Sequence, residues 1–452
     1  MLTKAAQPVN GDKTLMKQLP LGASTIAGPS PTDDLERQAI KTAAWRFIPL
    51  LALAYFFNYL DRTSVGFAAL TMNQDLGLTA TQFGYGAGIL FAGYCLFEVP
   101  SNLLMYRFGA RRWLARIMIT WGLVAAATAL AVGPSSFYAI RLLLGIAEAG
   151  FFPGVIFFLT LWFPAQYRTR VLAWFTVSTP LSSLLGGPMS AWLLQFNGHL
   201  GLTGWQWMFI VQGLPACLLG VLVLKLLADT PQDAQWLSTG QRDALQGAID
   251  REKSGTSKKK AFGVALRDPR VYLLSLISFG FTMGSYGIGI WLPQMLKEHG
   301  MSVSETGWWS AVPYFFATNG LLWWAGHVDR TGRRIANLCT ALIMAALALG
   351  ISPFFNTLAP AMVGITMALV GTISARTIFY TIPAKFLSGQ AAAGGLALIN
   401  CIGALGGFAG PYLVGFTKDA FHSFTAGMLA LAGVLAITTG LALSIRLFMK
   451  DE

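Results

Sequence analysis

The stretch SFYAIRLLLGIAEAGFFPGVIFFLTLW, residues 136–162, decides the fold class, because it is a long apolar run with only two charged side chains. A membrane core about 30 Å thick needs roughly 20 mostly apolar residues per helix, so this run is long enough to cross it. Its two charges, Arg141 and Glu148, lie seven residues apart, close to two helical turns, and therefore share one face. Charged side chains at membrane depth are costly and usually mark a functional site.

Similar apolar runs recur along the 452-residue chain, which is 54% hydrophobic and only 12% charged. A soluble domain carries about 25% charged residues, so this chain has too much apolar surface to fold in water alone. We therefore expect an all-α membrane protein with twelve spanning helices. Their predicted ranges are 44–70, 81–105, 112–132, 136–162, 168–195, 205–228, 270–296, 305–327, 334–355, 358–383, 389–417 and 423–447.

One long polar stretch divides the predicted helices into two sets of six. We expect a flexible cytoplasmic tail over residues 1–43, a six-helix bundle over 44–228 and a cytoplasmic loop with a short helix-like piece over 229–269. A second six-helix bundle is expected over 270–447 and a short cytoplasmic tail over 448–452.

Loop sequences repeat between the two halves. Phe163-Pro164-Ala165-Gln166 recurs as Ile382-Pro383-Ala384-Lys385, and Gly109-Ala110-Arg111-Arg112 echoes Thr331-Gly332-Arg333-Arg334. Parallel halves of this kind are typical of transporters in which two bundles rock around a central site.

The charge distribution predicts an orientation in a membrane. The net charge is +12, but Lys and Arg concentrate in alternate loops and form no basic stripe with interleaved aromatics. We therefore expect no nucleic-acid binding. Basic loops stay in the cytoplasm, so the pattern predicts a multi-pass protein of the cell inner membrane with both termini cytoplasmic.

Other classes of protein lack their sequence signals. The four cysteines lie in apolar runs without CxxC spacing: Cys95, Cys217, Cys339 and Cys401. This pattern disfavours a disulfide framework and a zinc site, so we expect them to be small buried residues. G-x-S-x-G, H-E-x-x-H and P-loop motifs are missing, so we expect neither an enzyme nor an ATP-driven pump, and no metal or cofactor. The histidines fall in predicted loops, which makes them poor proton carriers.

The stretch Gly326-His327-Val328-Asp329-Arg330-Thr331-Gly332-Arg333-Arg334 resembles the loop motif of the major facilitator superfamily. There, glycine permits close helix approach and the charged residues lock the inward-closed arrangement. The first-half copy departs from the pattern, because Tyr106 stands near the place of the acidic residue. The resemblance implies a gating motif made of Gly326, Asp329, Arg330, Gly332, Arg333, Arg334, Arg107, Arg111 and Arg112.

Five further stretches resemble one branch, the anion:cation symporter family, which includes bacterial permeases for tartrate, sugar acids and aromatic carboxylates. They are Asn58–Arg62, Phe97–Asn102, Arg141–Gly150, Gly204–Phe209 and Ala392–Asn400. The resemblance covers roughly residues 44–447. It implies two pseudo-symmetric six-helix bundles that import a small organic carboxylate, either a dicarboxylate, a sugar acid or an aromatic acid.

Two arginines and two acids at membrane depth form the candidate site. Arg62 and Arg141 are expected to bind the substrate, because a guanidinium stays protonated and grips a carboxylate with two hydrogen bonds. Asp61 and Glu148 are expected to carry protons, since burial favours the neutral form of a carboxyl group. The family resemblance implies the same roles. The alternative is a static ion-pair lattice that holds the N-terminal bundle together.

Tyr94 and Glu98 are one turn apart on one face of their helix. The Tyr94 hydroxyl is a candidate substrate ligand, and the alternative is packing between helices. Glu98 is expected to act in gating, through an ion pair with a loop arginine such as Arg168 or Arg170.

Two residues of the C-terminal half complete the candidate set. Asn400 matches a position that lines the cavity in relatives, and the alternative is an interhelical hydrogen bond. Arg376 is a second candidate anion ligand, or else extends to the cytoplasmic interface. The expected partners are a small organic anion, protons and membrane lipid, with the protein a monomer driven by the proton gradient. A proton-independent exchanger or uniporter and a transporter-like sensor of an organic acid are the alternative functions.

Overall fold

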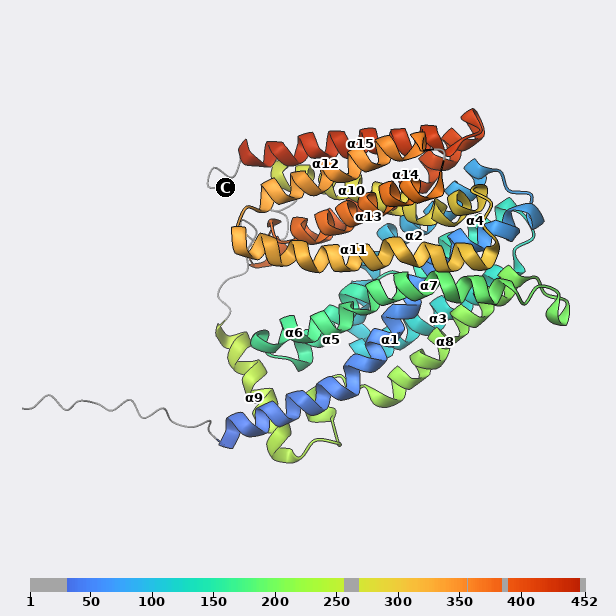
Figure 1. The fold of residues 1–452 in the computed structure, drawn as a ribbon. Helices are drawn as coiled ribbons and strands as arrows, with labels where there is room; N and C mark the ends of the chain where they lie inside the picture. The colour runs from blue at the N-terminus through green and yellow to red at the C-terminus, as the bar shows by residue number, and fades with distance from the viewer. Residues whose placement is uncertain (1–30, 256–267, 356, 384–388, 448–452) are drawn as a thin grey trace, which may run out of the picture.

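Helices make up nearly all of the described chain and run between two ends of the molecule (Figure 1). The computed structural model describes residues 31–255, 268–355, 357–383 and 389–447. The first 30 residues of the predicted N-terminal tail, the predicted C-terminal tail and part of the repeated loop at Ala384 and Lys385 lie outside the described residues.

The helices fall into an N-terminal set, a connector helix and a C-terminal set. The N-terminal set comprises α1 (Pro31–Asp75), α2 (Ala80–Phe108), α3 (Ala110–Ala127), α4 (Pro134–Glu148), α5 (Phe151–Trp162), α6 (Ala165–Thr176), α7 (Ser178–Leu194) and α8 (Gly204–Leu226). The connector holds α9 (Thr239–Gly255), and the C-terminal set comprises α10 (Pro269–Glu298), α11 (Val303–Thr331), α12 (Arg334–Ile351), α13 (Leu358–Phe379), α14 (Gly389–Phe421) and α15 (Phe424–Ser444).

Ten stretches of the described chain are long and apolar enough to cross a membrane, and α4 and α5 together form one of them. Two further segments, α6 with α7 and α11 by itself, bring the number of crossings to the predicted twelve.

The predicted ranges differ from these helices in two respects. First, α1 begins at Pro31, so residues 31–43 continue the first spanning helix.

Second, the fourth and fifth predicted helices are each broken into two. The fourth breaks at Ala149 and Gly150, and Gly150 has φ 88°, a left-handed conformation that favours glycine. A side chain at Gly150 would also lie 2.5 Å from the Ser101 hydroxyl. The break comes directly after Glu148 and therefore fixes where α4 ends at the candidate site.

Capping side chains set where several helices begin. Thr79 Oγ1 accepts from Gln82 N at 3.2 Å, and Gln82 Oε1 accepts from Thr79 N at 3.0 Å. Ser302 and Glu305 form the same reciprocal pair at the start of α11. These capping boxes satisfy N–H groups that have no partner inside the helix.

The two bundles meet at the end of the molecule away from α9 and diverge toward α9 (Figure 1). We call these the closed end and the α9 end. At the closed end, a side chain on Gly84 would lie 2.3 Å from the Pro411 carbonyl oxygen. The rings of Phe83 and Trp291 pack edge to face with their centroids 5.1 Å apart. One apolar core spans both bundles, whereas the buried residues of a second core come from the N-terminal bundle and from the connector with α9.

The chain ends and α9 share one end of the molecule. The beginning of α1 and the end of α15 both lie at the α9 end (Figure 1). The ring of Trp236, in the connector, stacks on Trp162 with centroids 5.5 Å apart, and Ile249 of α9 is buried. The connector is therefore docked on the N-terminal bundle.

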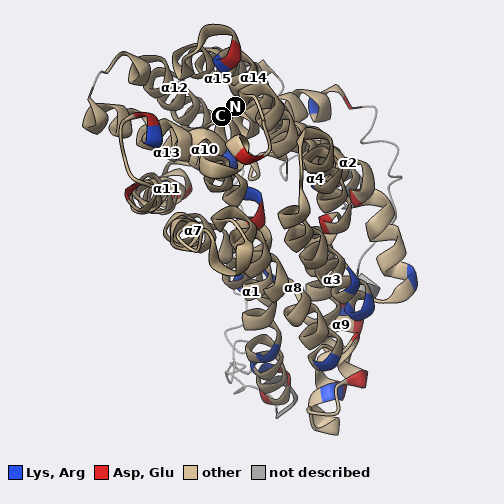
Figure 2. Ribbon diagram, turned by 90° about the vertical axis from the view of Figure 1, so that its right-hand side faces the viewer, with Lys and Arg blue, Asp and Glu red and all other residues tan. Residues whose placement is uncertain are grey.

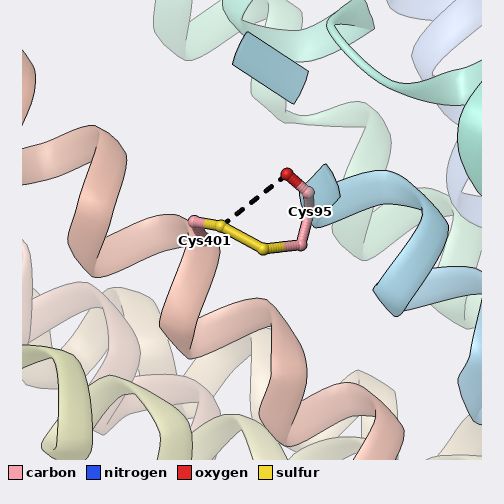
Figure 3. The surroundings of a disulfide bond; sticks show 2 residues. All are labelled: Cys95 and Cys401. Carbon is pink, nitrogen blue, oxygen red and sulfur yellow. Dashed lines mark hydrogen bonds between the residues drawn. A yellow bond between two sulfur atoms is a disulfide. The ribbon is translucent and has the colours of Figure 1, made fainter. Parts of the chain in front are cut away.

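A disulfide between Cys95 of α2 and Cys401 of α14 joins the two bundles (Figure 3). The expectation that the cysteines form no disulfide is wrong for this pair, while Cys217 and Cys339 are free. The two positions are 306 residues apart, so no local spacing signals the pair. Packing of α2 against α14 brings their Cα atoms to 5.1 Å.

Candidate functional site

Nearly all of the ribbon is free of charged residues when viewed along the helices (Figure 2), so the few charges inside the bundle stand out. Arg62 Nε donates a hydrogen bond to Glu148 Oε2 at 2.9 Å, which joins α1 to α4. Asp61 accepts a hydrogen bond from the indole N–H of Trp121 on α3. Arg141 lies within electrostatic range of both acids. The structure thus brings the four residues together.

These four side chains are withdrawn from solvent to different extents. Asp61, Arg141 and Glu148 are 1%, 1% and 0% exposed, whereas the Arg62 side chain is 14% exposed. One carboxylate oxygen of each acid, together with Nε and Nη1 of Arg141, has no hydrogen-bond partner. Unsatisfied ionisable groups are expensive inside a protein. The cluster is neutral in total when all four are ionised, and a change in one charge therefore disturbs the other three.

Helix geometry explains why two adjacent residues serve different neighbours. Successive residues of an α-helix point about 100° apart, so Asp61 faces α3 while Arg62 faces α2 and α4. The Arg62 guanidinium lies over the Tyr94 ring, 4.8 Å from its centroid, an arrangement favoured by cation–π attraction. Tyr94 therefore supports Arg62 with its ring. Sequence reasoning missed Trp121, because no local pattern links α3 to α1.

The C-terminal bundle contributes Arg376. Its side chain is exposed, and its electrostatic neighbours are tyrosines of α1, α10 and its own helix end: Tyr380, Tyr59, Tyr286 and Tyr55. Arg376 thus faces the region between the bundles. Asn400 of α14 accepts a hydrogen bond from the Tyr380 hydroxyl and links α13 to α14.

The tyrosines were not predicted as site residues. A sequence signal existed for two of them, because Tyr55 and Tyr59 precede Arg62 by seven and three residues and so share its helix face. Tyr286 gave no such signal, since its place depends on how α10 packs against α1 and α2.

The predicted ion pair of Glu98 with Arg168 or Arg170 is not among the ion pairs of the described residues in this conformation, and the gating role of Glu98 stays a prediction. Arg168 Nη1 instead lies 2.9 Å from Glu252 Oε1 on α9. Docking of α9, which the sequence did not reveal, supplies this competing acid. Glu98 lies within electrostatic range of Arg62 and therefore belongs to the neighbourhood of the central charges.

The loop-motif residues lie at the α9 end, where the bundles are apart. Five of those in the second half are exposed: Gly326, Asp329, Arg330, Gly332 and Arg333. The sixth, Arg334, is half-buried and donates to the Thr381 carbonyl oxygen at 3.0 Å. A side chain on Gly326 would meet nothing within 4 Å. Close helix approach at this glycine is therefore not realised in this conformation.

The first-half copy of the motif is arranged differently. Arg111 N donates to Asp229 Oδ1 at 2.8 Å, which ties the start of α3 to the segment after α8. Arg107 lies over the Phe108 ring, and Arg112 is exposed. In the described part of the chain, no group of three or more His, Cys, Asp or Glu side chains is placed to hold a metal.

Comparisons with known proteins agree with this architecture. A sequence profile described as Major Facilitator Superfamily matches residues 51–411. A protein of Agrobacterium vitis named for tartrate transport is 46% identical over 413 residues, covering 91% of this chain and 92% of the relative. A quinolone resistance transporter of Acinetobacter baumannii is 38% identical over 422 residues, covering 93% and 97%.

Solved structures of transporters share the fold. A bacterial homologue of the human lysosomal transporter Spinster, in an inward-facing and occupied conformation, matches with a TM-score of 0.74 at 19% identity. The match covers 90% of this chain and 97% of that one. This likeness confirms the predicted twelve-helix, all-α fold.

Proposed function

Because the chain belongs to the Major Facilitator Superfamily, we propose that it is a secondary transporter, active as a monomer, that imports a small organic carboxylate by proton symport. The similarity to a protein named for tartrate transport supports an organic acid as the substrate. We assign it to the cell inner membrane, with both termini and α9 in the cytoplasm. On this assignment the α9 end is the cytoplasmic end, and the conformation is inward-facing.

The Arg62–Glu148 ion pair carries this proposal. A substrate carboxylate and the Glu148 carboxylate compete for one guanidinium, whose Nε lies 2.9 Å from Glu148 Oε2. Protonation of Glu148 removes its charge and frees Arg62 to bind the substrate. The proton and the anion therefore favour the same state, and each raises the affinity for the other by the same factor.

Asp61 and Arg141 take part in the same replacement of an internal carboxylate by the substrate carboxylate. Asp61 is a second acid within the cluster, and one of its oxygens has no partner to hold it ionised. When both acids are protonated, the positive charges of Arg62 and Arg141 remain to be neutralised by the substrate. Arg141 is 1% exposed in this conformation, whereas the Arg62 side chain is 14% exposed, so we assign Arg62 to contact the substrate and Arg141 as the counter-charge behind it.

Alternating access follows from the packing of the bundles. The closed end is held by helix contacts so close that a side chain on Gly187 would lie 2.2 Å from the Ser310 hydroxyl. Such contacts exclude a path at that end while the α9 end is apart. Protons alone leave the cluster with a net positive charge, and the anion alone leaves it with a net negative charge. Only the empty cluster and the cluster loaded with both are neutral, so the low-dielectric interior favours rocking of the bundles in those two states.

Proteoliposomes containing the purified protein test this function. We expect an acidic exterior to drive accumulation of radiolabelled tartrate above its external concentration, and a protonophore to abolish the accumulation. Uptake that depends on internal anion and ignores the protonophore would identify the exchanger instead. Specific binding without uptake under either condition would identify the sensor.

A further inference from the structure

We propose that the central site binds a dicarboxylate, with one carboxylate on Arg62 of the N-terminal bundle and the other on Arg376 of the C-terminal bundle. This inference rests on the proposed transport function and narrows its substrate from organic acids in general to dianions.

The surroundings of Arg376 are the first reason. Arg376 is exposed as a residue, yet its guanidinium lies within electrostatic range of Tyr55 and Tyr59 on α1 and of Tyr286 on α10. It therefore faces the opposite bundle. Among the residues that the structure describes, Arg376 forms no ion pair. A positive charge held between helices without a carboxylate partner is an open position for an anion.

The second reason is that the two arginines share neighbours. Tyr55 and Tyr286 each lie within electrostatic range of both Arg62 and Arg376. The two guanidinium groups thus approach one region from opposite bundles. A dianion can give each arginine its own carboxylate, and the tyrosine hydroxyls near both arginines suit a hydroxylated linker because each can donate or accept a hydrogen bond.

The tyrosines are held in place by other aromatic rings. Tyr55 stacks on Phe175 with centroids 4.7 Å apart, and Tyr286 packs edge to face on Phe91 at 4.6 Å. Tyr286 also packs against both apolar cores. Fixed rings keep the lining between the arginines in place, so the site selects a ligand by its length and charge.

The two arginines differ in how readily they accept an anion. Arg376 has no acid to displace, whereas Arg62 is occupied by Glu148. The first carboxylate therefore binds Arg376, and the second displaces Glu148 from Arg62. A monocarboxylate on Arg376 leaves the Arg62–Glu148 pair intact. A dianion is thus bound more tightly than its monoanionic analogue and links substrate binding to the proton.

Binding of a matched pair of ligands to the purified full-length protein tests the proposal. The probes are tartrate and threonate, in which one carboxylate of the same four-carbon skeleton is replaced by a hydroxymethyl group. For the wild type we expect tartrate to bind about tenfold or more tightly than threonate, the scale of one charge-assisted contact. Arg376→Gln should remove most of this ratio, because it weakens tartrate more than threonate: both probes are then left with one carboxylate contact, at Arg62. Arg376→Lys, which keeps the charge, should retain part of the ratio.

Arg446→Gln is the matched control, because Arg446 is an exposed arginine in the short turn that follows α15. It should leave the tartrate-to-threonate ratio unchanged, and thermal unfolding establishes that each variant is folded. Equal wild-type affinities for the two probes, or an Arg376→Gln variant that weakens both probes equally, would overturn the dicarboxylate proposal while leaving transport of organic acids intact. A wild-type protein that binds neither probe and transports no organic acid would overturn the proposed function as well.

Discussion

Asp419 of α14 accepts hydrogen bonds from the backbone N–H groups of Ala80 and Thr81, at 3.1 and 2.7 Å, where α2 begins. The first N–H groups of a helix have no partner inside it, and the helix dipole favours an anion there. Since α14 and α2 belong to different bundles, this contact holds the closed end together. It must break whenever the bundles separate at that end.

Replacing Asp419 with Asn should loosen this contact, because the neutral amide loses the charge-assisted part of the interaction, about 0.3–1 kcal/mol. We expect amide hydrogen exchange at the beginning of α2 to become roughly two- to fivefold faster, the factor that such an energy corresponds to. Glu298→Gln is the control, since Glu298 pairs with Lys418 at 2.8 Å within the C-terminal bundle. Equal amide hydrogen exchange rates at the beginning of α2 in the wild type and in Asp419→Asn would show that the Asp419 contact does not hold the closed end together.

The Cys95–Cys401 disulfide links the two bundles and should prevent them from rocking when it is formed. We expect oxidation by diamide, which takes two hydrogen atoms from the thiol pair, to reduce substrate uptake by about tenfold or more, and dithiothreitol to restore it. A variant with Cys95→Ser should transport equally under both conditions. The double variant Cys217→Ser, Cys339→Ser keeps the pair and should remain sensitive to oxidation. Full transport by the oxidised wild type would contradict the rocking of these two helices.

Gly84→Ala should destabilise the closed end, because the added Cβ lies 2.3 Å from the Pro411 carbonyl oxygen, an atom of the opposing backbone. Overpacking of this kind costs about 1–3 kcal/mol, so we expect a lower thermal midpoint and slower transport. Gly433→Ala is the control, since a Cβ there meets nothing within 4 Å. That change should be neutral or stabilising, because alanine favours a helix. A Gly84→Ala variant as stable and active as the wild type would contradict the close packing.

The sequence predicted the fold well, because the membrane imposes a strong rule. Twelve apolar stretches of spanning length could be recognised one at a time, and each had to be helical in lipid. The breaks within the fourth and fifth helices were missed, because each falls inside a stretch that is apolar overall and neither is marked by a polar loop. Gly150 was the available signal for the first break, but a glycine within an apolar run does not reveal its φ of 88°.

The candidate site was predicted to the extent that it depends on single helices. The seven-residue spacing of Arg141 and Glu148 placed them on one face of one segment. Contacts between helices distant in the sequence were not predictable in the same way. The Cys95–Cys401 pair, the Trp121 hydrogen bond to Asp61 and the Arg168–Glu252 pair all depend on how helices pack.

Proton uptake on substrate binding tests the central claim most directly. Tartrate is added to the purified protein in weakly buffered solution near neutral pH, with a pH indicator present. We predict alkalinisation that saturates with tartrate and tighter binding at lower pH, because the substrate displaces Glu148 from Arg62 and the freed carboxylate takes a proton. Glu148→Gln, which mimics the protonated acid, should bind tartrate with reduced proton uptake. Saturable tartrate binding by the wild type with no proton uptake, at an affinity independent of pH, would contradict the account.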